Sequence, residues 1–223
     1  MLNGRNRNRA NGKPRQREYD KSMRTRAAIL AAAMDEFSVH GYGGARVDRI
    51  AKAAQLNNHA LYYHFGDKAE LFQAVLEHGY ESLRANMEPR DLGAMEPEAA
   101  MAKIVSDVFE FVQRMPRHMA IAFDVNRNRG ANLTPAIRKH VRAAAQQLID
   151  DLGFVLKRGR AARRFAAGID AEHLYFSIFA LCSFYFTNAY TISAGVSRDL
   201  LKPAAVRQRK QEIIRFVLAA LRP

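Results

Sequence analysis

The spacing of the apolar residues constrains this chain more than any other feature. From Met23 almost to the end, apolar side chains recur every three or four residues, and no stretch long enough to compete shows the alternation of a β-strand. Pro97, Pro135 and Pro203 each suit the first position of a helix, because that position needs no backbone N–H donor. The sequence therefore predicts an all-α protein.

The same spacing gives the expected elements and their grouping. The predicted helices run over about 24–40 and 46–54, then over a short helix that follows Asn57, and over 68–87, 97–115, 117–128, 135–157, 171–195 and 203–221. Pro89, Gly93 and Pro97 lie close together and indicate a joint between two parts of the chain. We expect a basic, disordered arm over residues 1–22, a small helical domain over 23–88 and a larger helical domain over 89–223, with a solvated loop near residues 157–164.

Two short helices stand unusually close together in the first domain. Only the segment 55–57 separates the helix over 46–54 from the next one, and Asn57 is a good N-cap for that next helix. Asp67 and Glu70 form a capping box at the start of the helix that follows. Two short helices joined by a tight turn predict a helix-turn-helix.

The charge of the chain favours a polyanionic partner. The formal net charge is +13, and residues 1–26 hold nine lysines and arginines against two acids. The excess is nevertheless spread along the chain, at +5 over residues 1–80 and +8 over 81–223, so charge alone does not locate a DNA site. The basic arm is either a solubilising tail or a segment that follows phosphates or enters a minor groove.

Several classes of protein lack support in the sequence. The single cysteine, Cys182, excludes a disulfide framework and a multi-cysteine zinc site, and the N-terminus has no apolar stretch typical of a signal peptide. We therefore expect a cytoplasmic protein. Motifs for metal hydrolysis, phosphate loops and nucleophile elbows are missing, which argues against an enzyme, and we expect no metal and no cofactor. A basic protein that binds any DNA sequence, or one tethered to a membrane, remains an alternative.

The densest motif is the string ARVDRIAKAAQLNNHALYYHFGDKAEL over residues 45–71, preceded by Gly41 and Tyr42. It resembles the tetracycline-repressor (TetR, or TetR/AcrR-type) family of one-component transcriptional regulators over residues 29–76. The LYxHFxxK core of that family stands here at residues 61–68. The resemblance implies an all-helical homodimer with an N-terminal DNA-binding domain and a C-terminal domain that binds a small molecule. Repression is the commoner mode of the family, but no residue distinguishes a repressor from an activator.

The N-terminal end of a recognition helix places side chains on base edges. The predicted base-reading residues are Asn58, His59, Ala60 and Tyr63. The predicted phosphate contacts are Arg46, Tyr62, His64 and Lys68. Leu61 and Phe65 belong to the core in either interpretation. Each prediction has an alternative. The two tyrosines could simply pack in the core, and His64 could be paired inside the protein. Arg46 and Lys68 could be solvated.

Two positions depart from the family pattern. Gln55 stands where many members have glycine in the turn, so it must adopt a left-handed conformation or shift the turn. Ala45 and Arg46 stand where members often have threonine or serine, and Arg46 can replace the usual hydroxyl contact to phosphate with a charged one.

The segment 174–196 contains no charged residue and by length could span a bilayer. Its many hydroxyl side chains and Asn188 make a buried helix of a soluble protein the better interpretation. In the family, the last two long helices pair with those of a second subunit, and the pattern here is compatible with this. The predicted dimer interface consists of Ile178, Leu181, Tyr185, Ile213, Phe216, Val217 and Ala220.

An effector pocket is expected among the middle helices. Its predicted lining is Phe109, Met115, Met119, Phe123, Tyr175 and Phe179, although such a stripe at helical spacing is more often plain core. The basic side chains nearby favour an anionic effector; they are Arg117, Arg127, Arg129 and Arg138. The identity of the effector and of the operator is not encoded in any motif.

Overall fold

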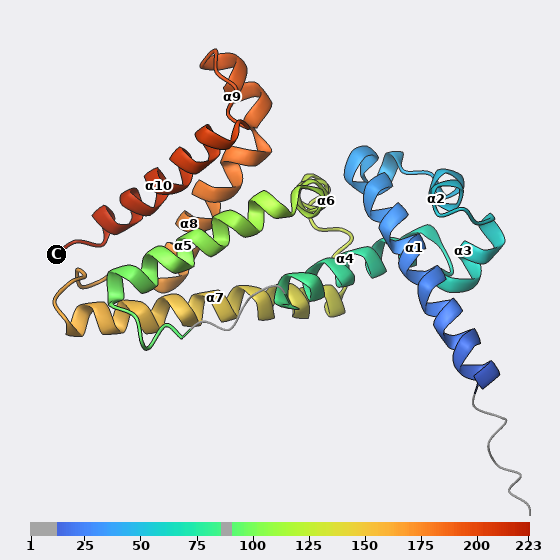
Figure 1. Ribbon diagram of the computed structural model, residues 1–223, viewed down its shortest axis with the longest axis horizontal. Coiled ribbons are helices and arrows are strands. Elements are labelled where there is room, and N and C mark those ends of the chain that lie inside the picture. The colour runs from blue at the N-terminus through green and yellow to red at the C-terminus, as the bar shows by residue number, and fades with distance from the viewer. Residues whose placement is uncertain (1–12, 86–90) are drawn as a thin grey trace, which may run out of the picture. The chain divides into compact units, whose positions relative to one another are not determined.

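The computed structural model describes residues 13–85 and 91–223. Its helices are α1 (Lys13–Gly44), α2 (Val47–Ala53), α3 (Asn58–Phe65), α4 (Lys68–Ala85), α5 (Pro97–Arg114), α6 (Pro116–Arg127), α7 (Pro135–Ala161), α8 (Ala171–Thr187), α9 (Ala189–Gly195) and α10 (Pro203–Ala220) (Figure 1). No strand occurs in these two ranges, and the predicted all-α class is confirmed. The first twelve residues of the expected arm and the expected joint at Pro89 lie outside the described residues.

The helices form two units by their contacts, and the division falls between Val75 and Leu76. The boundary expected from the sequence, between residues 88 and 89, lies outside the described residues. The observed division lies inside the continuous helix α4, so no proline or glycine marks it. Each unit has its own core and is described by itself.

In the first unit, α1 begins at Lys13 and is longer than predicted, because ten residues assigned to the disordered arm are helical. Its helical geometry is interrupted at Gly41, which has φ of 64°. This agrees with the expected end of the first helix at residue 40, because glycine enters the left-handed region without a steric penalty. The fully buried side chains come from all four helices of the unit; they include Ile29, Phe37, Ile50, Leu61, Leu71 and Phe72.

In the second unit, α5 is the central helix and contacts α6, α7, α8 and α10 (Figure 1). Its buried face includes Met101, Ile104 and Val105, none of which exposes measurable surface. Because apolar residues at three- and four-residue spacing cover one wide face, this helix can pack against several neighbours at once. The core of this unit therefore forms around the buried side chains of α5.

Two boundaries in the second unit correct the sequence-based expectation. The helix α7 continues to Ala161, so most of the expected loop at 157–164 is helical. Arg158 donates to the carbonyl of Leu92, and a Cβ on Gly159 would overlap Phe165, so both residues hold this end against other segments. The uncharged run 174–196 is divided between α8 and α9 at Asn188. None of the described helices is both long enough and apolar enough to span a bilayer.

Candidate nucleic-acid interface

The turn between α2 and α3 is closed by two backbone hydrogen bonds. The N–H of Leu56 donates to the carbonyl of Ala51 at 2.9 Å, and the N–H of Gln55 donates to Lys52 at 3.1 Å. This pair of bonds ends a helix with a left-handed residue, a position that glycine usually occupies. Gln55 takes that position with φ of 58°, so the first of the two expected alternatives is the one that occurs.

The helix α3 starts as the sequence predicts. The side-chain oxygen of Asn57 accepts the N–H of Ala60 at 2.8 Å and caps the first turn. Leu61 and Phe65 are buried on one side, four residues apart. This spacing fixes which face of the short helix points outward, and the remaining side chains therefore define the candidate interface.

The predicted base-reading and phosphate-contacting residues lie at the surface to different degrees. Tyr63 is 80% exposed and Tyr62 is 47% exposed, so simple packing does not account for them. Asn58, His59 and Arg46 are also exposed, whereas Ala60, His64 and Lys68 are half-buried. The exposed set thus lies at the start of α3, along its outer face, and at the start of α2.

The start of α2 is held by a carboxylate from α1. Glu36 accepts the backbone N–H of Arg46 at 2.9 Å and the side-chain Nε of Arg49 at 2.8 Å. Burial alone would raise the pKa of Glu36, but the hydrogen bonds from Arg49 and Arg46 outweigh it and lower the pKa below its usual value of 4.5. Arg46 itself makes no side-chain cap, and its side chain is exposed beside the interface.

The end of α3 is held by a cation from α1. The guanidinium of Arg26 donates to the carbonyl of His64 at 3.3 Å and lies 4.3 Å from the centre of the Phe65 ring. A cation is favourable at this end of a helix, because the last carbonyls carry partial negative charge. Arg26 therefore belongs to the packed face of α1, although the sequence analysis counted it only among the nine basic residues of the segment 1–26.

Sequence reasoning missed the roles of Glu36 and Arg26, yet a signal for both was present. Each lies on the apolar stripe of the first helix, three residues from Ala33 or Ile29. A charged residue on a buried stripe needs a partner, because burying a charge without one is costly. The positions of Glu36 and Arg26 on the apolar stripe therefore indicated that both side chains have partners, but they did not identify those partners.

The junction of α3 and α4 is also tightly built. Gly66 has φ of 68°, and Asp67 accepts the N–H of Glu70 at 2.8 Å, which is the first half of the predicted capping box. The ammonium of Lys68 lies 5.0 Å from the centre of the Tyr42 ring. A cation at this distance is attracted to the face of the ring, which holds Lys68 beside the start of α4.

The predicted effector-pocket residues do not all gather at one place. Phe109 is fully buried against Tyr185 and Phe186, whereas Phe123 is 65% exposed. Tyr175 and Phe179 do lie together, with ring centres 6.1 Å apart. Met119 packs at the edge of the same core, and Met115 ends α5. The pocket lining therefore stays a prediction, in which Phe123 is the residue that is largely exposed to solvent.

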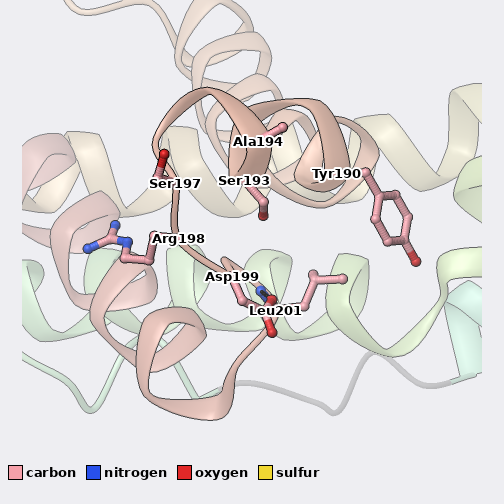
Figure 2. A pocket seen from close by; sticks show the side chains of 7 residues that line it. All are labelled: Tyr190, Ser193, Ala194, Ser197, Arg198, Asp199 and Leu201. Atoms are coloured by element: carbon pink, nitrogen blue, oxygen red, sulfur yellow. Dashed lines mark hydrogen bonds between the residues drawn. The ribbon is translucent and has the colours of Figure 1, made fainter.

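A hollow of about 580 Å³ is present elsewhere, beside α9 (Figure 2). It is lined by Tyr190, Ser193, Ala194, Ser197, Arg198, Asp199 and Leu201. Two of its polar side chains accept hydrogen bonds from nearby backbone groups. Ser193 accepts the N–H of Leu200, and Asp199 accepts the N–H of Leu201. This hollow does not coincide with any of the predicted pocket residues.

The predicted dimer interface also needs correction. Ile178, Tyr185, Ile213 and Val217 are buried in the core of the protomer itself, and Leu181 is partly buried there. Phe216 is 64% exposed, and Ala220 is exposed as well. The large apolar side chains exposed on α8 are Phe176 and Phe184 instead, at 50% and 57%. The outward face of α8 is therefore a different stripe from the predicted one.

Cys182 has no catalytic character in this fold. It is fully buried, and burial raises the pKa of its thiol to about 12, although Arg209 acts in the opposite direction. The thiolate is the reactive form of cysteine, so this side chain is a poor nucleophile at neutral pH.

Comparison with families matches both parts of the chain. A model described as bacterial regulatory proteins of the tetR family matches residues 29–75. A second model, described as the C-terminal domain of tetracyclin repressor-like proteins, matches residues 97–217.

Among individual proteins, the chain is 31% identical over 194 residues to the HTH-type transcriptional repressor NicS of Pseudomonas putida, which covers 87% of this chain and 89% of NicS. It is 27% identical over 197 residues to the HTH-type transcriptional regulator RutR of Escherichia coli K12, covering 88% and 90%. A putative transcriptional regulator of Streptomyces coelicolor, SCO4942, has a similar structure with a TM-score of 0.64 at 22% identity, covering 89% and 99%. The structure of AibR in complex with isovaleryl coenzyme A and operator DNA matches with a TM-score of 0.65 at 16% identity, covering 86% and 97%.

Proposed function

Because the chain belongs to the TetR family of bacterial regulatory proteins, we propose that this DNA-binding transcriptional regulator is a homodimeric repressor. In this proposal it occludes a palindromic operator and is released when a small molecule binds the second unit. Occlusion requires no surface beyond the DNA-binding face itself. Two copies are required because a palindrome presents the same half-site twice.

The observation that carries the proposal is the outward face of α3. Its first turn is capped by Asn57, and its buried side is fixed by Leu61 and Phe65. Asn58, His59, Ala60 and Tyr63 are the proposed base-reading residues. An amide such as that of Asn58 can pair with adenine, and Ala60 is small enough to contact a thymine methyl group.

The proposed phosphate contacts surround this face. They are Arg46, Tyr62, His64 and Lys68. Arg46 is supported in this role because Glu36 holds only its backbone and leaves the guanidinium exposed. Lys68 is supported by its position at the positive end of α4, where anions bind favourably. These contacts would orient the protein, and the base-reading residues would supply the specificity.

A second copy of the chain is the proposed partner of α8 and α10. We name their exposed apolar residues the dimer face; it consists of Phe176, Ala180, Phe184, Phe216 and Ala220. The three on α8 lie four residues apart, so they share one side of that helix. The helices α8 and α10 contact each other, so in this proposal the second copy covers both helices. Three large aromatic side chains exposed together are typical of an interaction site.

Release by an effector is supported by the course of α4. This helix starts immediately after the recognition helix and continues to Ala85 in the second unit, beyond the boundary at Val75. A ligand that binds the second unit along α4 can therefore bias the orientation of the same helix that follows α3.

Selection of bound fragments from the native genome tests the DNA-binding part of the proposal. We expect the selected fragment to be bound at least about 10³-fold more tightly than random DNA near 0.15 M salt. Tyr63→Ala should lose about tenfold or more on the selected fragment and little on random DNA. Tyr190→Ala, which removes an aromatic side chain that is 82% exposed on α9, is the matched control and should change neither affinity. Equal affinity for both DNAs in the unaltered protein would refute specific regulation.

Transcription in a purified system tests the repressor part. A template that carries the selected fragment should yield less transcript when the protein is added, with half of the effect near the measured Kd. Recovery of transcript on addition of a ligand identified by binding would support release. An increase of transcript on adding the protein alone would show that it activates instead.

A further inference from the structure

Polar side chains from three helices gather in the second unit where the surroundings are mainly apolar. His118 of α6 lies against Gly79 of α4, the residue before Tyr80, and Tyr80 interacts electrostatically with Tyr175 of α8. The Nε2 atom of His118 is buried and has no hydrogen-bond partner among the described residues. Buried polar atoms in native proteins are nearly always paired, so an unpaired one indicates a missing partner.

The position of His118 is fixed by a glycine on α4. A Cβ at Gly79 would lie 2.6 Å from Cδ2 of the imidazole, which is closer than real Cβ contacts come, and 3.1 Å from Nε2. A larger residue at position 79 would therefore displace the imidazole from the backbone of α4. This contact holds His118 beside the same turn of α4 that carries Tyr80.

Burial keeps all three groups uncharged in the free protein. Burial lowers the pKa of His118 below its usual value of 6.5, and electrostatic interactions with His78 and Arg117 lower the pKa further. Burial raises the pKa of Tyr175, and burial together with the nearby Tyr175 raises the pKa of Tyr80. The two phenols therefore remain hydrogen-bond donors at neutral pH.

The side chains around this cluster can contact an apolar body. The ring of Phe179 lies 6.1 Å from that of Tyr175, and Met119 packs at the edge of the same core as both. Aromatic and methionine side chains make favourable contacts with flat or branched apolar groups. The cluster thus joins hydrogen-bond donors with an apolar wall.

We propose that Tyr80, His118 and Tyr175 form the site of a small organic anion with one carboxylate, and that His118 takes up a proton from solvent when this anion binds. The inference rests on the proposed release by an effector and names the chemical class of that effector. The carboxylate accepts hydrogen bonds from the imidazolium and the two phenols, and the apolar part of the ligand lies on Tyr175 and Phe179.

The charged residues that suggested an anion from the sequence are not the ones that carry this site. Arg127 is paired with Asp124, and Arg138 donates to the carbonyl of Leu133. Arg129 is exposed on the turn after α6. Only Arg117 acts on His118, through its charge. The effector is therefore still expected to be an anion, but because of His118 and the two tyrosines and not because of these arginines.

Matched pairs of acids and amides test the proposal, with benzoate and benzamide, and butyrate and butyramide, as probes. Thermal melting and titration calorimetry of the full chain are performed at pH 6 and pH 8. We expect at least one carboxylate to raise the Tm and its amide to leave the Tm unchanged. Because binding takes up a proton, affinity for that carboxylate should be about tenfold higher at pH 6 than at pH 8. No carboxylate effect in either pair, or equal effects of acid and amide, would overturn the proposal.

Variants assign the effect to His118. His118→Gln should weaken carboxylate binding at least tenfold and remove its pH dependence, and Gly79→Ala should do the same by displacing the imidazole. His78→Gln changes the other histidine near the site and should keep the pH dependence. If the dependence disappears in His78→Gln and persists in His118→Gln, the assignment is wrong.

DNA binding separates this inference from the function on which it rests. His118→Gln and Gly79→Ala should bind the selected genomic fragment as the unaltered protein does, but carboxylate should no longer release them. If the unaltered protein binds carboxylate as described and shows no specific DNA binding, the proposed function fails and the ligand site remains. If specific DNA binding is intact and carboxylates have no effect, only the ligand site fails.

Discussion

Gln55 stores backbone strain in the turn of the helix-turn-helix, because a residue with a Cβ has φ of 58° there. Gln55→Gly should relieve this strain and raise the free energy of unfolding of the DNA-binding unit by about 1 kcal/mol. Gln55→Ala is the control, because alanine keeps the Cβ and should give no such gain. Denaturant unfolding followed by circular dichroism measures both changes. A gain for alanine equal to that for glycine would show that strain at this residue is not the cause.

Glu36 is the residue that joins α1 to the start of α2, so Glu36→Gln should destabilise the unit by about 2 kcal/mol through loss of charged hydrogen bonds. Since the pKa of Glu36 is lowered in the folded state, its stabilisation is complete above pH 4.5 and is lost as pH falls through the folded pKa. The difference in Tm between the unaltered protein and Glu36→Gln should therefore shrink as pH falls below 4.5.

Glu96→Gln provides the comparison for this pH dependence. Glu96 stands at the N-cap of α5, is exposed and makes no capping hydrogen bond with its side chain. Its replacement should change Tm little at any pH between 7 and 4. A gap for Glu36→Gln that stays constant over this range would show that the carboxylate charge is not what stabilises the contact.

At the scale of the element, the cap of α3 couples stability to recognition. Asn57→Ala removes the acceptor for Ala60 N–H and should cost about 1 kcal/mol. Because Asn58 and His59 lie in the uncapped turn, affinity for the selected DNA fragment should also fall, by several-fold. Asn57→Asp keeps an acceptor at the same place and should retain both properties. Measured affinities that are equal for alanine and aspartate would contradict a role of the cap in recognition.

The elements of the first unit could be predicted where local chemistry determines them. Asn57, Asp67 and Gly41 mark helix ends by capping or by a left-handed conformation, and all three do so in the structure. The start of α1 was placed at residue 24 because the basic residues before it suggested a solvated arm, whereas the helix begins at Lys13. The density of basic residues therefore gave a wrong start for α1, because no capping or helix-breaking residue marked the true start.

At the scale of the whole molecule, prediction was limited by packing between distant segments. The run 174–196 has no charged residue, so the sequence did not distinguish the outward side of the helix from the inward one. Ile178 and Tyr185 were assigned to the dimer interface, yet Tyr185 donates to the carbonyl of Leu200 from inside the protomer. Similarly, no local pattern brings Gly79 and His118 together. Contacts of this kind depend on the tertiary fold, and the candidate DNA-binding helix was predictable because its burial pattern is local.

The dimer face is the property of the whole molecule that one double variant can test. Phe184→Lys with Phe216→Lys places two charges where a second copy would bury two exposed rings, and burial of an unpaired charge is strongly unfavourable. The mass in solution should fall from that of a dimer to about 25.2 kDa by light scattering, while helicity is unchanged. Phe123→Lys alters an aromatic side chain that is 65% exposed on α6 and should leave the dimer intact. Since a monomer contacts only one half of a palindrome, the double variant should bind the selected fragment at least about 100-fold more weakly. A double variant that remains dimeric would show that the two copies meet through another surface.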